Sequence, residues 1–197
     1  MNFGERYTQA IMLIDEAYQE NNEIVSIGNN TYPKEYLYAL RMVDELEKFC
    51  PDADEEVFLS ARCQHLYRWE IPRNTYPLDR KGYHQWRSFL YTYQSNKTEK
   101  LLQKVDYPNE FIERVKIMIE KKDLKNNPKS QLLEDVVCLV FLNYDLADFI
   151  EKHAKDVQKL KRIIKSTWLK MSPKAHETAL KIPFADDVKA FVLEAVL

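Results

Sequence analysis

Along most of the chain, apolar residues recur every three or four positions, which is the spacing of one face of an α-helix. The pattern first appears at residues 4–20. It recurs in six further segments and predicts helices at residues 34–49, 55–69, 82–105, 108–122, 130–152 and 156–169. A last pair of short helices is expected after Ser172, separated by Pro183. The hydrophobic pattern therefore predicts an all-α protein.

Turn-forming residues mark the boundaries between these helices. Gly28, Asn29 and Asn30 form a turn signature, and Pro33 favours a helix start because its fixed φ suits the first helical turn. Residues 71–81 contain two prolines and lack the alternation of a strand. We therefore expect this segment to be a loop that its aromatic and arginine side chains keep ordered.

The composition agrees with a single helical domain. Of the 197 residues, 45% are hydrophobic and only three are glycine. Such a chain can bury a sizeable core, and it has too little turn punctuation for a fold of many short strands. We expect residues 1–197 to form one helical bundle, with a core at residues 34–152 and C-terminal helices at residues 155–197 packed on it.

Acidic and basic residues are nearly balanced, with a formal net charge of -2, so no basic tail indicates binding to nucleic acid or an anionic membrane. Cys50, Cys63 and Cys138 are odd in number and widely spaced, which indicates reduced core thiols. The N-terminal segment lacks the composition of a secretory signal, and no apolar run reaches the length of about 18 residues that a membrane span needs. We expect a soluble, cytoplasmic protein without a membrane partner.

Residues 58–73 join an apolar helix to a polar end. The polar end holds a group of side chains that can bind a ligand, namely Gln64, His65, Arg68, Trp69 and Arg73. Polar groups that arrive where a core helix ends need partners or a ligand, because burying them without hydrogen bonds is costly.

A second polar pair lies in the most apolar helix, residues 130–152, where Glu134 and Asp135 interrupt the apolar run. We expect this helix at the centre of the bundle. The predicted pocket lies between it and the helices at residues 34–49 and 55–69, and the loop at residues 70–81 closes it.

Two sequence blocks, residues 61–73 and 131–142, are distinctive, and residues 82–87 and 167–172 support them. Together they resemble the domain of unknown function family 4202 over nearly the whole chain. This resemblance implies no activity.

The order of helices and spacers also resembles that of the HD-domain metal-dependent phosphohydrolases, which are all-helical and bind metal through a His, a His-Asp doublet and a distant Asp. The similarity is clearest at residues 83–142. It implies an HD-like topology and places Asp135 at the position of the last metal-binding Asp.

The other metal positions of that family carry different residues here. The alignment puts Tyr38 at the first His, Gln64 at the His of the doublet and His65 at its Asp, while Lys121 and Lys122 replace a further His pair. A transition metal needs several converging nitrogen or oxygen donors, and tyrosine and glutamine are poor substitutes. We therefore expect no cofactor, or at most a weakly held divalent metal on His65 and Asp135.

The same alignment suggests a group of cations in place of the metal. Side chains expected to face the cleft are Arg41, Arg68, Arg73, Arg87 and Lys121, with Trp69, Tyr76, Tyr83 and Trp86 as flat walls. Arginine forks suit phosphate or carboxylate, so the expected partner is a small phosphorylated or anionic ligand such as a nucleotide.

The functional hypothesis that follows is a phosphohydrolase. In it His65 is the general acid or base, Asp135 orients it or remains as a metal ligand, and the arginines clamp the phosphate. This requires His65 and Asp135 to be neighbours, with Tyr38 close by.

Three other interpretations stay open. His65 and Asp135 could form a structural link between two core helices. The pocket could belong to a binding or interaction module without catalysis. The basic helix at residues 155–170 could bind RNA, although such a charge run is usually a solvated helix face, so nucleic acid ranks below a small-molecule ligand.

Overall fold

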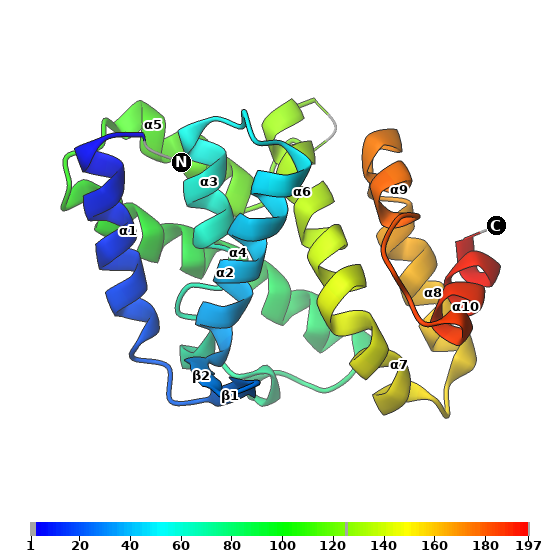
Figure 1. The fold of residues 1–197 in the computed structure, drawn as a ribbon. Helices are drawn as coiled ribbons and strands as arrows, with labels where there is room; N and C mark the ends of the chain where they lie inside the picture. Colours follow the sequence, from blue (N-terminus) through cyan, green and yellow to red (C-terminus); the bar gives the residue numbers. More distant parts are fainter. Residues whose placement is uncertain (1–2, 125, 197) are drawn as a thin grey trace. The chain divides into compact units, whose positions relative to one another are not determined.

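The computed structural model describes residues 3–124 and 126–196, and the chain forms two compact units that meet in sequence between Ser130 and Gln131. Both units are built mainly from α-helices (Figure 1). The first unit also contains a small β-hairpin, which the all-α prediction did not include. No helix in the described part of the chain is long and apolar enough to cross a membrane.

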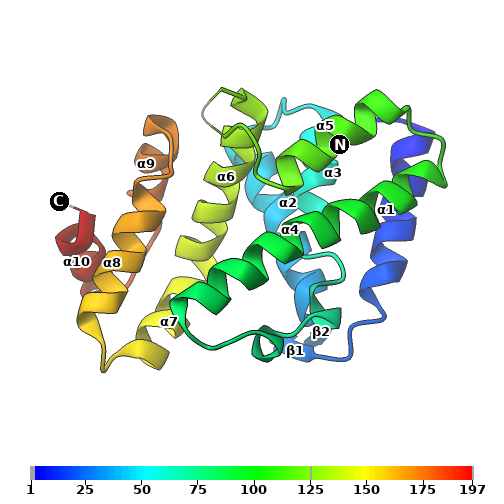
Figure 2. The same cartoon turned by 180° about the vertical axis from the view of Figure 1, so that it is seen from behind.

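The first unit packs five helices around one core. They are α1 (Glu5–Tyr18), α2 (Lys34–Phe49), α3 (Glu55–Arg62), α4 (Arg80–Gln103) and α5 (Asn109–Ile119). Helix α3 packs against α1, α2 and α5, and α4 crosses behind these helices, as the reverse view in Figure 2 shows. The predicted bounds of α2 agree with the structure, and those of α1, α4 and α5 differ by a few residues at their ends.

The hairpin consists of β1 (Ile24–Ile27) and β2 (Asn30–Pro33), paired antiparallel with Ile24 opposite Pro33. Its turn is Gly28 and Asn29, and Gly28 has a φ of 58°, which glycine adopts without steric cost. The turn was predicted from these residues. The strands were not, because both strands are largely exposed and so carry no alternation of apolar and polar residues.

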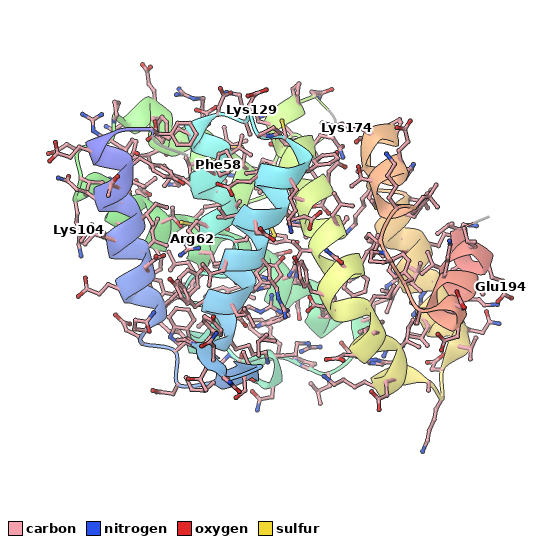
Figure 3. All side chains as sticks on the ribbon, viewed as in Figure 1. Phe58, Arg62, Lys104, Lys129, Lys174 and Glu194 are labelled. Atoms are coloured by element: carbon pink, nitrogen blue, oxygen red, sulfur yellow. The ribbon has the colours of Figure 1, made fainter. Side chains whose placement is uncertain are left out.

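A half-buried ion pair joins α1 to α3. The Arg62 guanidinium donates to Asp15 Oδ1 from Nε at 2.8 Å and from Nη2 at 2.5 Å, and it lies over the ring of Tyr36. The hydroxyl of Tyr18 donates to the Arg62 carbonyl at 2.8 Å. Figure 3 labels Arg62 at the end of α3. These bonds satisfy a charge that would be costly to bury alone, and they fix the position at which α3 ends.

Helix α3 ends at Arg62, seven residues before the predicted end at 69. The following backbone forms successive tight turns, in which Leu66 N donates to Cys63 O and Arg68 N donates to His65 O. Tyr67 has a φ of 57°, a left-handed conformation that a right-handed helix cannot continue. The periodic apolar residues continue past Arg62, but this backbone places Gln64 and His65 in turns and not on a helix face.

The loop predicted at residues 71–81 is ordered by side-chain bonds to its backbone, as expected. Arg73 donates to the carbonyls of Tyr76, Pro77 and Asp79 at 3.0, 2.6 and 3.2 Å. Trp86 of α4 donates from Nε1 to the carbonyl of Ile71 at 2.9 Å. One short 3₁₀ turn, Arg73–Thr75, lies within this loop, and another, Arg68–Glu70, comes directly before it.

The second unit contains most of α6 and the helices that follow it. Its elements are α6 (Pro128–Val140, which begins in the first unit), a π-helical turn (Phe141–Asp145), α7 (Leu146–His153), α8 (Val157–Trp168), α9 (Pro173–Ala179) and α10 (Asp186–Val196). The π turn interrupts the single helix predicted at residues 130–152 because its backbone inserts an extra residue into the helical turn. Helices α8 and α10 pack side by side, with Leu160, Ile164 and Val192 buried.

Candidate functional site

His65 is held from both sides of its ring. Its Nδ1 lies 2.6 Å from Glu35 Oε2, in the first turn of α2, and its Nε2 lies 2.8 Å from Arg68 Nη1. The ring of Tyr38, one turn further along α2, stacks on the imidazole with the centroids 3.8 Å apart. The prediction that Tyr38 lies close to His65 is confirmed.

The two partners of His65 fix its protonation. Arg68 can only donate, so His65 Nε2 accepts, and His65 Nδ1–H donates to the Glu35 carboxylate. Burial, and then the positive charge of Arg68, lower the pKa of His65 to about 4, so the ring is neutral near pH 7. The pKa of Glu35 is also lowered, because its contacts with His65 and Arg68 outweigh the raising effect of burial.

Positively charged side chains gather beside this ring. The Arg68 guanidinium lies over Trp86, 4.8 Å from the ring centroid. Arg87, one residue further along α4, donates to the hydroxyl of Tyr91 at 2.8 Å, and Lys121 Nζ lies 5.8 Å from the centroid of the same tyrosine ring. Arg68 therefore lies against Trp86, whereas Arg87 and Lys121, two further cations predicted to face the cleft, both contact Tyr91.

The charges of these groups affect one another. Burial lowers the pKa of Arg68, the charge of Glu35 opposes this effect and the charge of Arg87 adds to it. The pKa of Arg87 is raised instead, because burial, which would lower it, is outweighed by the effects of Tyr91 and Tyr83. The carboxylate beside Arg68 is Glu35, 3.8 Å from Arg68 Nε, and it already accepts from His65. Within the described residues, no carboxylate forms an ion pair with Arg87. We call Glu35, Tyr38, His65, Arg68, Trp86 and Arg87 the His65 cluster.

The remaining predicted residues of the first unit lie around this cluster in different ways. Gln64 is buried next to His65, and Arg41 is half-buried on α2, one turn after Tyr38. Arg73 lies over Trp86, 5.8 Å from its centroid, while its N–H groups bind the backbone of the loop. Trp69 packs against Tyr18 and Tyr67 at the core, so Trp86 is the tryptophan that contacts Arg68.

Asp135 lies in the second unit and is buried at 3% exposure. Its Oδ1 accepts from Gln131 Nε2 at 2.9 Å and from the backbone N–H of Ser172 at 2.8 Å. These bonds tie α6 to the turn that begins α9. We predicted that His65 pairs with Asp135 and that the pocket includes residues 130–152. Both predictions involve residues of the two units, and both stay predictions.

The donor set around His65 does not fit a divalent metal. The described His, Cys, Asp and Glu side chains form no group of three or more that could hold one. The Nε2 lone pair, which would bind a metal, instead accepts from the cationic Arg68, and Tyr38 presents its ring face and not its oxygen.

Sequence reasoning missed Glu35 and Tyr91. Glu35 was part of an acidic first helical turn, where a carboxylate is common because it favours the helix dipole. A usable signal was its spacing of three residues from Tyr38, which places both side chains on one face of α2. Tyr91 follows Arg87 by four residues, and the same rule applies to this pair on α4.

The basic segment at residues 155–170 forms α8 and the turn after it. Lys161 forms an ion pair with Glu194 of α10, while Arg162 and Lys165 are exposed. The charged side chains of this segment are therefore in part paired and in part solvated, as is common for a charge run on a helix.

Comparison with known protein families matches residues 8–192 to the family described as Domain of unknown function (DUF4202). No curated protein and no solved structure matches the chain.

Proposed function

The chain belongs to the family described as Domain of unknown function (DUF4202), and we propose that it binds a phosphorylated small molecule, such as a nucleotide, at the His65 cluster. The observation that carries this proposal is the pair of Arg68 and Arg87. The carboxylate beside Arg68 is Glu35, which also pairs with His65, and no carboxylate of the described residues forms an ion pair with Arg87.

An anion bound by Arg68 and Arg87 would give Arg87 a negatively charged partner. A phosphoryl group has oxygens for both guanidinium forks, and hydrogen bonds between ionised partners are about twice as strong as neutral ones. Tyr38, half-buried beside His65, adds flat apolar surface near the cations, which suits an aromatic ring in the ligand. The combination favours a nucleotide over a bare inorganic anion.

Hydrolysis of the phosphate ester is the reaction that the Glu35–His65 pair favours. When a phosphate attracts Arg68, Nε2 of the neutral imidazole is free to accept a proton from water. The water oxygen then bonds to phosphorus as the ester P–O bond breaks, and the leaving alkoxide receives the proton. Glu35 holds Nδ1–H and stabilises the imidazolium between these transfers.

The proposed origin of this site is an HD-like fold with altered metal positions, in which Arg68 and Arg87 have replaced the ion as the source of positive charge. Tyr38 beside His65 supports this reading, because the alignment puts both at former metal positions. Asp135 would be the last residue of that motif to keep its type. No step of the proposed reaction passes through a metal.

Calorimetric titration with inorganic phosphate and with AMP tests binding. Arg87→Gln is expected to weaken both ligands at least tenfold, because it removes one of the two guanidiniums. Arg80→Gln, at an exposed position of the same helix, is the matched control and is expected to bind as the wild type does. Equal affinity of wild type and Arg87→Gln would contradict the proposal.

A panel of phosphorylated substrates, assayed with and without Mn²⁺, separates an enzyme from a binding module. The enzyme proposal expects turnover that His65→Gln abolishes while phosphate binding persists. Phosphate binding without turnover on any substrate would support the binding module instead. The circular dichroism spectrum of His65→Gln should match the wild type, so that loss of turnover is not loss of fold.

A further inference from the structure

A cavity of about 370 Å³ lies in the first unit, where the first turns of α1 and α3 meet the chain that leads into α5 (Figure 1). Its lining includes Phe3, Glu5, Arg6, Glu55, Tyr107 and Phe111, and no residue of the His65 cluster. Pockets that bind small molecules have volumes from about 300 Å³ upwards, so this cavity has room for a small ligand.

Aromatic rings form the apolar wall of the cavity. The rings of Tyr107 and Phe111 stack with their centroids 4.5 Å apart, and Phe3 packs edge-on against Tyr7 at 5.0 Å. The turn before α5 holds Tyr107 in place, because its backbone N–H donates to the carbonyl of Leu102 at 3.2 Å. Such a wall suits the apolar part of a ligand.

Tyr107 also holds two opposite charges apart. The Arg6 guanidinium lies over its ring, 5.5 Å from the centroid, whereas its hydroxyl donates to Glu55 Oε1. Burial, and then the Glu55 carboxylate, raise the pKa of Tyr107, so the hydroxyl keeps its proton and stays a donor. Among the described residues, Arg6 and Glu55 form no ion pair with each other or with any other side chain.

Glu5 adds a second carboxylate to the lining. It is exposed, accepts from Gln9 Nε2 at 3.3 Å, and pairs with no cation of the described residues. A purely cationic ligand would leave Arg6 without a partner, and a purely anionic ligand would meet two carboxylates. The ligand that complements the lining carries one charge of each sign beside an apolar group.

We propose that this cavity binds a free α-amino acid with an apolar side chain. The carboxylate of the amino acid pairs with Arg6, which can hold it through two parallel hydrogen bonds. Its ammonium group binds Glu55 and Glu5, and its side chain packs on the aromatic wall. The site is separate from the proposed phosphate site and does not depend on it.

NMR chemical-shift titration with L-phenylalanine, L-leucine and L-methionine tests binding. The protein is expected to bind at least one of them at concentrations up to about 10 mM, with shifts at the amides of Arg6, Glu55 and Phe111 and none at His65. The absence of binding by all three, or shifts confined to other parts of the chain, would overturn the proposal.

The carboxamide of the bound amino acid separates the two charges of the ligand, because it keeps the ammonium group and lacks the carboxylate. Wild-type protein is expected to bind it at least tenfold more weakly than the amino acid. Equal affinity would show that a peptide N-terminus or a simple amine fits as well, and that the free amino acid is not the ligand.

Two substitutions test the assigned contacts. Arg6→Gln is expected to weaken the amino acid at least tenfold and to leave its carboxamide unchanged within twofold. Glu55→Gln keeps an acceptor for the Tyr107 hydroxyl and is expected to weaken both ligands. Arg80→Gln and Glu16→Gln, at exposed positions outside the cavity, are the matched controls and should change neither ligand.

The pattern of losses distinguishes recognition from an effect on the fold. If Arg6→Gln weakens the amino acid and its carboxamide equally, Arg6 does not bind the carboxylate and the assignment is wrong. Circular dichroism spectra that match the wild type show that each variant is folded.

Discussion

His65 shows how one residue takes its chemistry from its neighbours. Glu35 and Arg68 hold the two ring nitrogens at 2.6 and 2.8 Å, and the pKa of about 4 keeps the ring neutral. A neutral imidazole can accept a proton at Nε2 only after Arg68 moves. In the proposed reaction, binding of an anion to Arg68 would therefore prepare His65 to act as a base, and this would couple ligand binding to catalysis at a single side chain.

This protonation state predicts a pH dependence of stability. The lowered pKa means that the unfolded chain takes up a proton on His65 below about 6.5, whereas the folded chain does so only near 4. The free energy of unfolding should therefore fall as pH decreases from 6.5 to 4, and His65 contributes on the order of 3 kcal/mol to the decrease.

Urea titrations at several pH values measure this effect. Other groups titrate in the same window, so the informative quantity is the difference between wild type and His65→Gln. The variant is expected to lose less stability between pH 6.5 and 4. Parallel curves for the two proteins would show that the neutral ring is not an important feature of the folded state.

At the scale of elements, the loop before α4 is fixed by close backbone packing. Gly82, in the first turn of α4, packs directly against Pro77. A Cβ atom at Gly82 would come within 2.1 Å of the Pro77 carbonyl oxygen. That oxygen also accepts from Arg73. The Asp79 side chain accepts from Gly82 N–H at 2.7 Å and caps the helix.

Gly82→Ala is expected to destabilise the protein by roughly 1–3 kcal/mol, because the clash with Pro77 outweighs the gain of about 1 kcal/mol that alanine brings to a helix. Ser88→Ala, at an exposed position of the same helix, provides the control and should be neutral or slightly stabilising. Urea unfolding checks both. A stabilised Gly82→Ala variant would mean that the loop can move away from the new Cβ atom without loss of stability.

Asp135 has a structural role at the same scale. Its bonds to Gln131 and to the Ser172 N–H join α6 to the start of α9. Asp135→Ala would leave the N–H of the half-buried Ser172 without this acceptor and is expected to lower the free energy of unfolding by about 1–3 kcal/mol. Thermal unfolding of the variant, with Asp148→Ala at an exposed position as control, measures the loss. An unchanged midpoint would contradict a structural role.

At the scale of the whole molecule, the division into two compact units predicts that core mutations act locally. Ile164 in α8 and Leu59 in α3 are buried at 1% and 0% exposure in different units. Truncating either side chain to alanine should lower the free energy of unfolding by about 2–5 kcal/mol. Native-state hydrogen exchange of Ile164→Ala should rise mainly in residues 157–196, and that of Leu59→Ala mainly in residues 5–119.

The same experiment tests the single-domain expectation. If either substitution raises exchange uniformly over both units, the chain unfolds as one cooperative domain. A local response would show that the units have separate stabilities.

The sequence by itself determined the helical class, the family and most helix positions, because periodic apolar residues and proline or asparagine boundaries act locally. It also identified His65, Arg68 and Arg87 as chemically unusual. It could not identify Glu35 as the partner of His65, since 30 residues separate them and only packing of α2 on the end of α3 brings them together.

Only the tertiary structure decided where α3 ends, how the hairpin pairs and which charges interact. The left-handed backbone at Tyr67 overrides a helical pattern that continues past it, because the bond between Tyr18 and the Arg62 carbonyl and the burial of Leu66 fix the chain there. The unpaired amides of Gln64 and Gln94 are likewise visible only in the fold, since a missing partner is a property of the whole surrounding structure.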